Sequence, residues 1–328
     1  MSLTSHLDDP TGPIGQFIKR RFSRTGRLTK AANQQLKNAD TIRPVNVDNT
    51  YPYGVIGAAI DYRIRYAFAI TPNQRLVAWK GALKLAIKRP ESDDDILLDW
   101  IDLKGLTLPP AVLETGVAQG PYALSLIRAF FNQLENVLNT IQPQGRRLER
   151  EHERTLDRYC IVLSLFEQVF RTNAYLRGPL MVPPVKHSIE ELLALSQEAC
   201  IDDLGALFTQ FFDRYASLLS KPSILNPIFA GSLDIGGADA DIIVEGCLID
   251  MKTSVSSQIK AEYLYQLAGY LLLDYDDHYS IDSVGIYMAR QGLLFHWPVS
   301  EFVSELTGDN THSLASLRQE FRALFQNV

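Results

Sequence analysis

Three aspartates and one lysine lie close together in the stretch ADADIIVEGCLIDMKTS, residues 238–254. Two short apolar runs in this stretch predict two β-strands. Side chains alternate between the two faces of a strand, so residues two apart point the same way. Asp239 and Asp241 therefore share a face at the start of the first strand, and Asp250 and Lys252 share a face at the end of the second.

The turn between these strands decides whether the charged groups meet. If Glu245 and Gly246 form that turn, the hairpin returns Asp241 to the neighbourhood of Asp250 and Lys252. Carboxylate oxygens are natural ligands of Mg²⁺, and a nearby lysine can orient an attacking water or stabilise charge on a phosphate. This pattern predicts phosphodiester hydrolysis. The alternative is a solvated surface hairpin whose aspartate–lysine salt bridge contributes at most ~1 kcal/mol.

The helix predicted after the second strand adds two polar side chains. It carries QLAGY at residues 266–270, which places Gln266 and Tyr270 one turn apart on the same helix face. Both side chains can then reach the site that contains Lys252.

These residues together resemble the PD-(D/E)XK nuclease superfamily. In that superfamily an acid opens one strand, here Asp241, and the next strand ends in acid-x-Lys, here Asp250 to Lys252. The pair Gln266 and Tyr270 resembles the QxxxY motif of the RecB-type branch, which includes CRISPR-associated exonucleases. The match covers about residues 228–297, and a hairpin predicted at 283–297, turning at QG, can supply the remaining strands.

The resemblance implies a fold and a set of roles. We expect an α/β protein with a restriction-endonuclease-like core, a central mixed sheet flanked by helices, and a large all-helical insertion. Asp241, Asp250 and the backbone carbonyl of Met251 would bind Mg²⁺ or Mn²⁺. Lys252 would position the attacking water, and the QxxxY pair would orient Lys252 or contact a phosphate. Thr253 could donate a hydrogen bond to the nucleic-acid backbone.

RecB-type members often carry a further histidine or acid on an early helix after glycine. The sequence GAAID at 57–61 resembles that arrangement, with Asp61 in the usual histidine place. This makes Asp61 a candidate metal ligand, although it could instead pair with Arg65 one turn further on. Rival acids precede the predicted strands more directly: Glu198, Asp202 and Asp203.

The order of predicted elements gives the domain organisation. Apolar residues recur at helical spacing over 54–68, 75–89, 124–141 and most of the chain up to residue 220. We expect a basic N-terminal arm or small helical cap at 1–45, first core helices at 46–90, a helical insertion at 91–225 and the nuclease core at 226–328. The insertion could grip DNA or dock a partner protein.

Composition favours a globular protein, with 46% hydrophobic residues in 328. We expect a cytoplasmic location and no membrane partner, because no signal peptide and no long apolar run is present. Cys160, Cys200 and Cys247 cannot supply the four thiolates of an iron–sulfur cluster, so we expect none. The net charge of −6 does not indicate nucleic-acid binding, but six basic residues lie within 19–30 and could contact phosphates. The alternative for this basic cluster is a solvated helix face.

Other catalytic patterns are missing from the sequence. The six histidines show no paired metal-binding spacing, and neither a GxSxG elbow nor a phosphate-binding GK[ST] loop occurs. The leading hypothesis is therefore a Mg²⁺-dependent deoxyribonuclease, with RNA as a further possible substrate. The alternative is a catalytically silent nuclease-like module that binds nucleic acid or serves as a scaffold.

Overall fold

The computed structural model describes residues 3–44, 54–73, 76–86, 122–171, 178–180, 185–308 and 313–326. Both ends of the helix predicted at 75–89 lie outside these residues. The chain divides into two compact units. Residues 1–43 and 220–328 form the first, here called the sheet unit, and residues 44–219 form the second, here called the helical unit.

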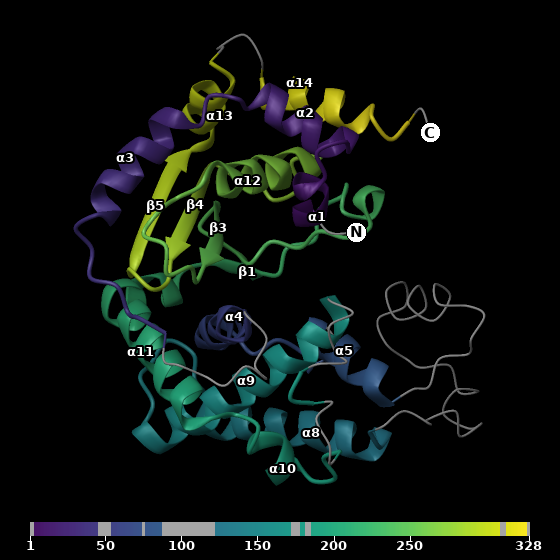
Figure 1. The fold of residues 1–328 in the computed structure, drawn as a ribbon, viewed down its shortest axis with the longest axis vertical. Coiled ribbons are helices and arrows are strands. Elements are labelled where there is room, and N and C mark those ends of the chain that lie inside the picture. Colours follow the sequence, from purple (N-terminus) through teal and green to yellow (C-terminus); the bar gives the residue numbers. More distant parts are fainter. Residues whose placement is uncertain are drawn as a thin grey trace. The chain divides into compact units, whose positions relative to one another are not determined.

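The sheet unit contains a mixed five-stranded sheet with the order β1-β2-β3-β4-β5 (Figure 1). All neighbouring strands are antiparallel except β3 and β4, which are parallel. Parallel neighbours need a crossover connection, and helix α12 supplies it. The elements are β1 (Ser223–Leu225), β2 (Ile242–Val244), β3 (Cys247–Lys252), α12 (Ala261–Leu273), β4 (Ser283–Met288) and β5 (Leu293–Pro298). The expectation of an α/β fold with a mixed sheet flanked by helices is confirmed.

A two-residue turn joins β2 to β3, as the sequence predicts. Val244 pairs with Cys247, and the residues between them, Glu245 and Gly246, have φ values of 47° and 80°. Positive φ at both central positions matches the twist of a tight hairpin. Because this turn is so short, it fixes the register of both strands.

The β4–β5 hairpin also lies where the sequence predicts it. Met288 pairs with Leu293, so the connection includes Gln291 and Gly292. Gly292 has φ of 61°, a conformation that glycine adopts without a steric penalty. Arg290 and Gln291 of this connection are both buried.

Helices cover one face of the sheet. In Figure 1, α12 lies between the sheet and the helices α2 and α14. Leu264, Leu267 and Leu271 of α12 are fully buried in the core of this unit; a buried leucine contributes about 1.5–3 kcal/mol. The other helices are α1 (Leu3–Asp8), α2 (Pro13–Arg21), α3 (Gly26–Leu36), α13 (Val299–Thr307) and α14 (Leu314–Arg322).

The N-terminal segment belongs to this core. Leu3, Phe17 and Phe22 are buried together with residues of α12 and β4. The approach of α1 to α12 is close, since a Cβ added at Gly269 would lie 2.8 Å from the Leu3 side chain. The segment expected as a basic arm or helical cap thus contributes three packed helices.

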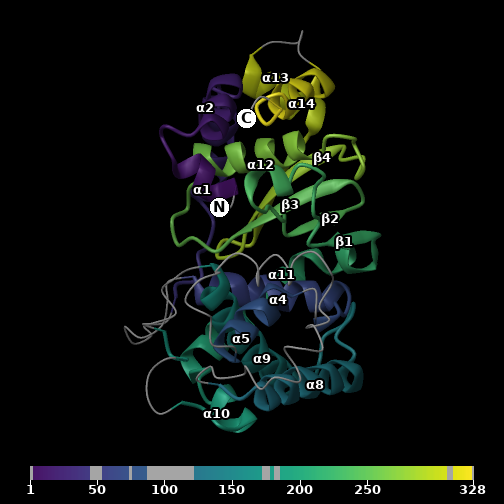
Figure 2. The same ribbon diagram turned by 90° about the vertical axis from the view of Figure 1, so that its right-hand side faces the viewer.

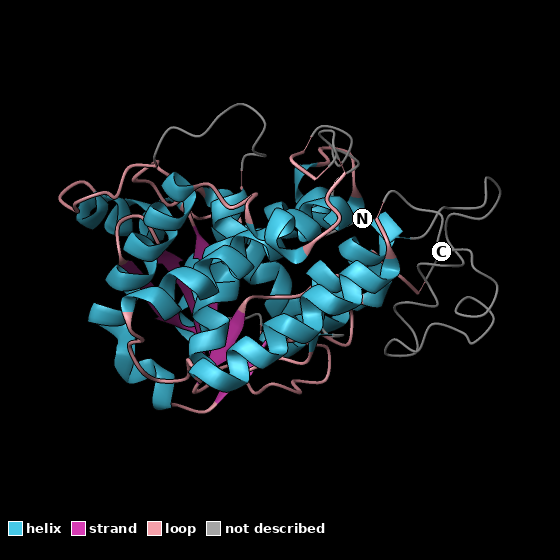
Figure 3. Cartoon of the chain, turned by 90° about the horizontal axis from the view of Figure 1, so that it is seen from below, coloured by secondary structure: helices cyan, strands magenta, loops and turns pink. Residues whose placement is uncertain are grey.

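Helices make up the described part of the helical unit, and α9 packs against most of the others (Figure 2). Figure 3 shows the helices and strands of the chain by colour. Helix α9 packs against α4, α5, α8, α10 and α11. At Gly81 of α5 an added Cβ would lie 1.8 Å from the backbone oxygen of Phe166 in α9, so only glycine permits this crossing. The elements are α4 (Val55–Phe68), α5 (Val77–Ala86), α8 (Leu124–Ile141), α9 (Arg150–Arg171), α10 (Ile189–Leu193) and α11 (Glu198–Tyr215).

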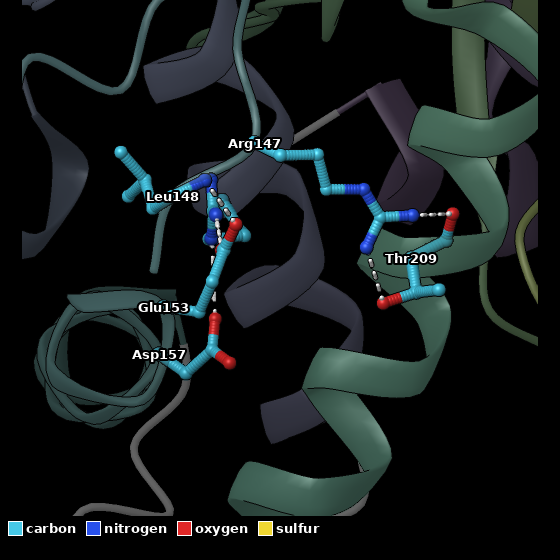
Figure 4. A network of polar contacts seen from close by, with 6 residues as sticks. Arg147, Leu148, Glu153, Asp157 and Thr209 are labelled. Carbon is cyan, nitrogen blue, oxygen red and sulfur yellow. Dashed lines mark hydrogen bonds and ion pairs between the residues drawn. The ribbon is translucent and has the colours of Figure 1, made fainter. Parts of the chain in front are cut away.

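Figure 4 shows polar contacts within the helical unit, some of them exposed, such as those of Arg147 with Thr209. The fully buried guanidinium of Arg63 contacts the carboxylates of Glu153 and Asp157 and lies 3.5 Å from the ring centre of Phe208. Burial raises the pKa of Asp157 to about 7, against the opposing effect of Arg63. Among the described helices of both units, none is long and apolar enough to cross a membrane.

Candidate functional site

The β2–β3 hairpin brings the predicted acids together. The register of the hairpin pairs Ile242 with Ile249, so the next position places Asp241 opposite Asp250. Cross-strand neighbours point to the same face. The Oδ2 atom of Asp241 accepts a hydrogen bond from the backbone nitrogen of Met251 at 2.6 Å. The predicted acid pair is therefore held at the carboxyl end of β3.

Lys252 contacts two different elements of the site. Its Nζ lies 2.7 Å from Asp250 Oδ2 and donates a hydrogen bond to Gln266 Oε1, also at 2.7 Å. It also lies 5.0 Å from the ring centre of Tyr263, within the range of a cation–π contact. The Asp250 side chain is only 3% exposed, whereas Lys252 is 19% exposed. The Lys252 ammonium thus contacts a buried carboxylate while the lysine side chain remains partly exposed to solvent.

The charges of the site determine the protonation of Lys252. Burial lowers its pKa, but the neighbouring carboxylates of Asp250 and Asp241 raise it by more, so that the pKa lies above its ordinary value. Lys252 is therefore an ammonium ion at neutral pH. An ammonium only donates hydrogen bonds, which requires the oxygen of the Gln266 amide to face it.

Helix α12 extends this chain of contacts. Gln266 Nε2 donates a hydrogen bond to the hydroxyl of Tyr270 at 2.8 Å. Burial, followed by the charges of Asp250 and Asp241, raises the pKa of Tyr270 well above its ordinary value. The hydroxyl stays neutral and can accept from the amide. The resulting chain of polar contacts runs from Asp250 through Lys252 and Gln266 to Tyr270.

Three neighbours of the site have no predicted role. Tyr263 lies below Lys252 and is three residues before Gln266, so helical spacing already places it on the same face of α12. Phe229 stacks on Tyr270 with ring centres 5.6 Å apart. No local sequence pattern indicates Phe229 as part of the site, because it lies more than ten residues before β2 in the chain. Asp239 is the third acid whose charge helps to raise the pKa of Tyr270, after burial as the largest cause.

The candidates for a third metal-binding acid all belong to the helical unit. Asp61 lies on α4 and forms an ion pair with Arg65 one turn further on, which is the alternative weighed from the sequence. Glu198 and Asp202 both form ion pairs with Arg154. Asp203 is buried on α11. Three of these acids thus have arginine partners within the helical unit, and Asp241 and Asp250 are the acid pair of the sheet unit.

The donor set of the site fits a magnesium or manganese ion. Within the described residues, no group of three or more histidine, cysteine, aspartate or glutamate side chains is arranged to hold a metal. Mg²⁺ needs fewer protein ligands, since it keeps several waters and binds through one or two carboxylates together with substrate phosphates. Asp241, Asp250 and the carbonyl of Met251 offer such a set. The buried Oδ2 of Asp250 has Lys252 Nζ, 2.7 Å away, as its ion-pair partner.

Comparison with known proteins adds no relative. No family model matches the sequence, and neither a curated protein nor a solved structure is significantly similar to it. Any assignment of function to this chain therefore depends on the chemistry of the residues around β3 and α12.

Proposed function

We propose that the sheet unit is a restriction-endonuclease-like nuclease core and that the protein is a Mg²⁺- or Mn²⁺-dependent deoxyribonuclease. One observation carries the proposal: Lys252 lies between the buried carboxylate of Asp250 and the amide of Gln266. A surface salt bridge, the alternative weighed from the sequence, would have neither a buried carboxylate nor a second partner on a separate helix.

The acids and the lysine have separate roles in this proposal. Asp241, Asp250 and the backbone carbonyl of Met251 would hold the metal ion. When bound, the ion supplies Lewis-acid polarisation of a phosphate oxygen and lowers the pKa of a water molecule. Lys252 donates hydrogen bonds to the attacking water or to the phosphate, where negative charge develops.

The reaction is a simple hydrolysis. The oxygen of water forms a bond to phosphorus, one ester P–O bond breaks, and the departing oxygen gains a proton that ultimately derives from the water. Gln266 fixes the direction of the Lys252 ammonium, and Tyr270 fixes the Gln266 amide through its hydroxyl. The two α12 side chains are positioning residues.

Cleavage assays test the proposal. Purified protein is incubated with linear, circular and single-stranded DNA and with RNA, in Mg²⁺, in Mn²⁺ and in EDTA. We expect metal-dependent DNA cleavage that Lys252→Met reduces by at least about 10²-fold, the scale seen when one charge-stabilising donor is lost. Lys221→Met is the matched control, because this exposed lysine pairs with Glu245 at the opposite end of β3.

The outcomes separate the two functional hypotheses. Cleavage that is equal in Lys252→Met, or absent from every DNA substrate in both metals, would refute the nuclease proposal. Binding of DNA without any cleavage would support the alternative of a silent nuclease-like module. Cleavage of RNA but not of DNA would support the proposed catalytic site and would show that its substrate is RNA instead of DNA.

A further inference from the structure

The segment between β3 and α12 directly follows the candidate active site. Residues 253–260, TSVSSQIK, contain four hydroxyl side chains and end in an exposed lysine. Asn33 of α3 holds the far end of this segment with both ends of its amide. Its Oδ1 accepts from the backbone nitrogen of Ile259 at 2.6 Å, and its Nδ2 donates to the Ile259 carbonyl at 3.1 Å.

Two further contacts hold the beginning and the middle of the segment. Arg290 donates from Nε to the Thr253 carbonyl at 3.1 Å. The hydroxyls of Ser257 and Thr41 lie 3.2 Å apart. The segment is therefore a fixed loop, held by α3, by the residues after α3 and by the β4–β5 connection.

The N-terminal basic cluster is divided by the fold. Arg21 and Arg27 form ion pairs with Glu320 and Glu305, and Lys19 donates to a backbone carbonyl. All three side chains thus have a partner within the sheet unit. The Arg27 side chain is nevertheless 79% exposed, as the solvated-face alternative expects.

Three other lysines lie around the loop. Lys30 is three residues before Asn33 and Lys37 is four residues after it, so both lie on the flank of α3 from which Asn33 reaches the loop. Lys260 adjoins Ile259, the residue that Asn33 holds. All three lysines are exposed, and none forms an ion pair within the part of the chain that the structure describes. On a chain with net charge −6 this local excess of positive charge is distinctive.

We infer that Lys30, Lys37 and Lys260 form a track for the phosphodiester backbone of DNA, which the loop at 253–260 connects to Lys252. The inference rests on the proposed function and names how that site receives its substrate. Lysines neutralise backbone phosphates without reading sequence, so the track binds DNA of any sequence. The side-chain hydroxyls of Ser254 and Ser256 lie between the lysines and the proposed catalytic residues, where they can donate hydrogen bonds to the DNA backbone.

Fluorescence anisotropy with labelled DNA tests the track, at several salt concentrations and in EDTA so that no cleavage occurs. Each lysine–phosphate contact contributes about 0.7–0.9 to the slope of log Kd against log salt. In the triple variant Lys30→Ala, Lys37→Ala, Lys260→Ala we expect this slope to fall by about 2–3. At 0.1 M salt the same contacts correspond to Kd values weaker by about 100-fold or more.

A second triple variant controls for total charge. Arg20→Ala, Lys221→Ala and Arg322→Ala remove three exposed basic residues from other parts of the sheet unit. We expect this variant to keep a slope within one unit of the wild type. An equal loss in both triple variants, an unchanged slope in the track variant, or no salt-dependent binding by the wild type would each overturn the inference.

The assay distinguishes failure of the track from failure of the proposed function. If the wild type binds DNA through the three lysines but never cleaves it, the track stands and the nuclease proposal fails. If the wild type cleaves DNA and the track variant binds DNA normally, the nuclease proposal stands and the track fails. RNA of the same sequence forms a further arm, and lysine-dependent binding of RNA with none of DNA would overturn the assignment to DNA.

Discussion

Replacing Lys252 by methionine should destabilise the sheet unit as well as reduce the proposed cleavage. The Asp250 carboxylate is only 3% exposed, and its ion-pair partner is the Lys252 ammonium 2.7 Å away. At that distance and an effective dielectric constant of about 20, the Coulomb attraction is about 6 kcal/mol. Desolvation of both groups offsets part of it, and breaking a buried pair typically costs about 3–5 kcal/mol. Because Lys252 is 19% exposed, we expect a loss near the lower end, about 3 kcal/mol.

A double-mutant cycle isolates this interaction. Asp250→Asn alone leaves an ammonium that can reach water, so we expect it to cost about 1 kcal/mol. The combined variant leaves no buried charge and should lie within about 1–2 kcal/mol of the wild type. The two single variants together would then cost about 2–3 kcal/mol more than the double variant, which is the coupling free energy.

The measurement needs to report on the sheet unit, because a chain with two units need not unfold in one step. Urea unfolding of the whole chain in EDTA is combined with hydrogen exchange of the β3 and α12 amides, which reports the local opening free energy. Adding Mg²⁺ should stabilise Lys252→Met more than the wild type, because the ion then supplies the missing positive charge. A Lys252→Met protein within 0.5 kcal/mol of the wild type, or a cycle without coupling, would refute the reasoning.

Three further perturbations test the packing of both units. Gly81→Ala should destabilise the helical unit by about 3 kcal/mol or more in urea unfolding, because its Cβ would overlap the Phe166 carbonyl. Gly26→Ala is the control, since an added Cβ there meets nothing within 4 Å, and it should be neutral or stabilising. Equal effects of the two substitutions would contradict the close helix crossing. The raised pKa of Asp157 means that the folded state binds the extra proton between about pH 4 and 7, so this group's contribution to the unfolding free energy falls as pH rises through that window. The free-energy difference between Asp157→Asn and the wild type should therefore shift in favour of the variant between pH 5 and 7 by up to about 1.4 kcal/mol per pH unit, and a pH-independent difference would exclude the shift. Asn33→Ala should speed hydrogen exchange in residues 253–260 by about tenfold or more, since it removes two hydrogen bonds of about 1 kcal/mol each, while β4 amides keep their protection.

The parts of the site that the sequence predicts are those fixed by local geometry. A two-residue turn at Glu245 and Gly246 sets the register of β2 and β3, and the register alone places Asp241 opposite Asp250. Helical spacing likewise places Gln266 and Tyr270 on one face. The long amphipathic helices are predicted for the same reason, and α8 has the bounds that its apolar spacing indicates.

Features that depend on distant packing are not accessible in this way. Strand β1 has three residues, too few for a period of two to be recognised, and its partner β2 follows only after a long connection. The N-terminal helices look like a solvated basic segment because their apolar residues are interspersed with charges. Their burial depends on α12, which lies more than 220 residues further along the chain.

The two hydrogen bonds between Asn33 and the Ile259 backbone show why the loop beside the site is the part that is hardest to predict. Asparagine within a helix of polar residues carries no sequence signal, and its partner, the backbone of Ile259, is 226 residues away. Backbone groups look alike in every sequence, so a contact with one can only be recognised once the fold is known. The same holds for the lysines beside Asn33, whose proximity to the loop follows from that contact. The residues of the candidate site can thus be predicted from local spacing, whereas the position of the loop that follows them is set by long-range packing between the first helices and the last strands.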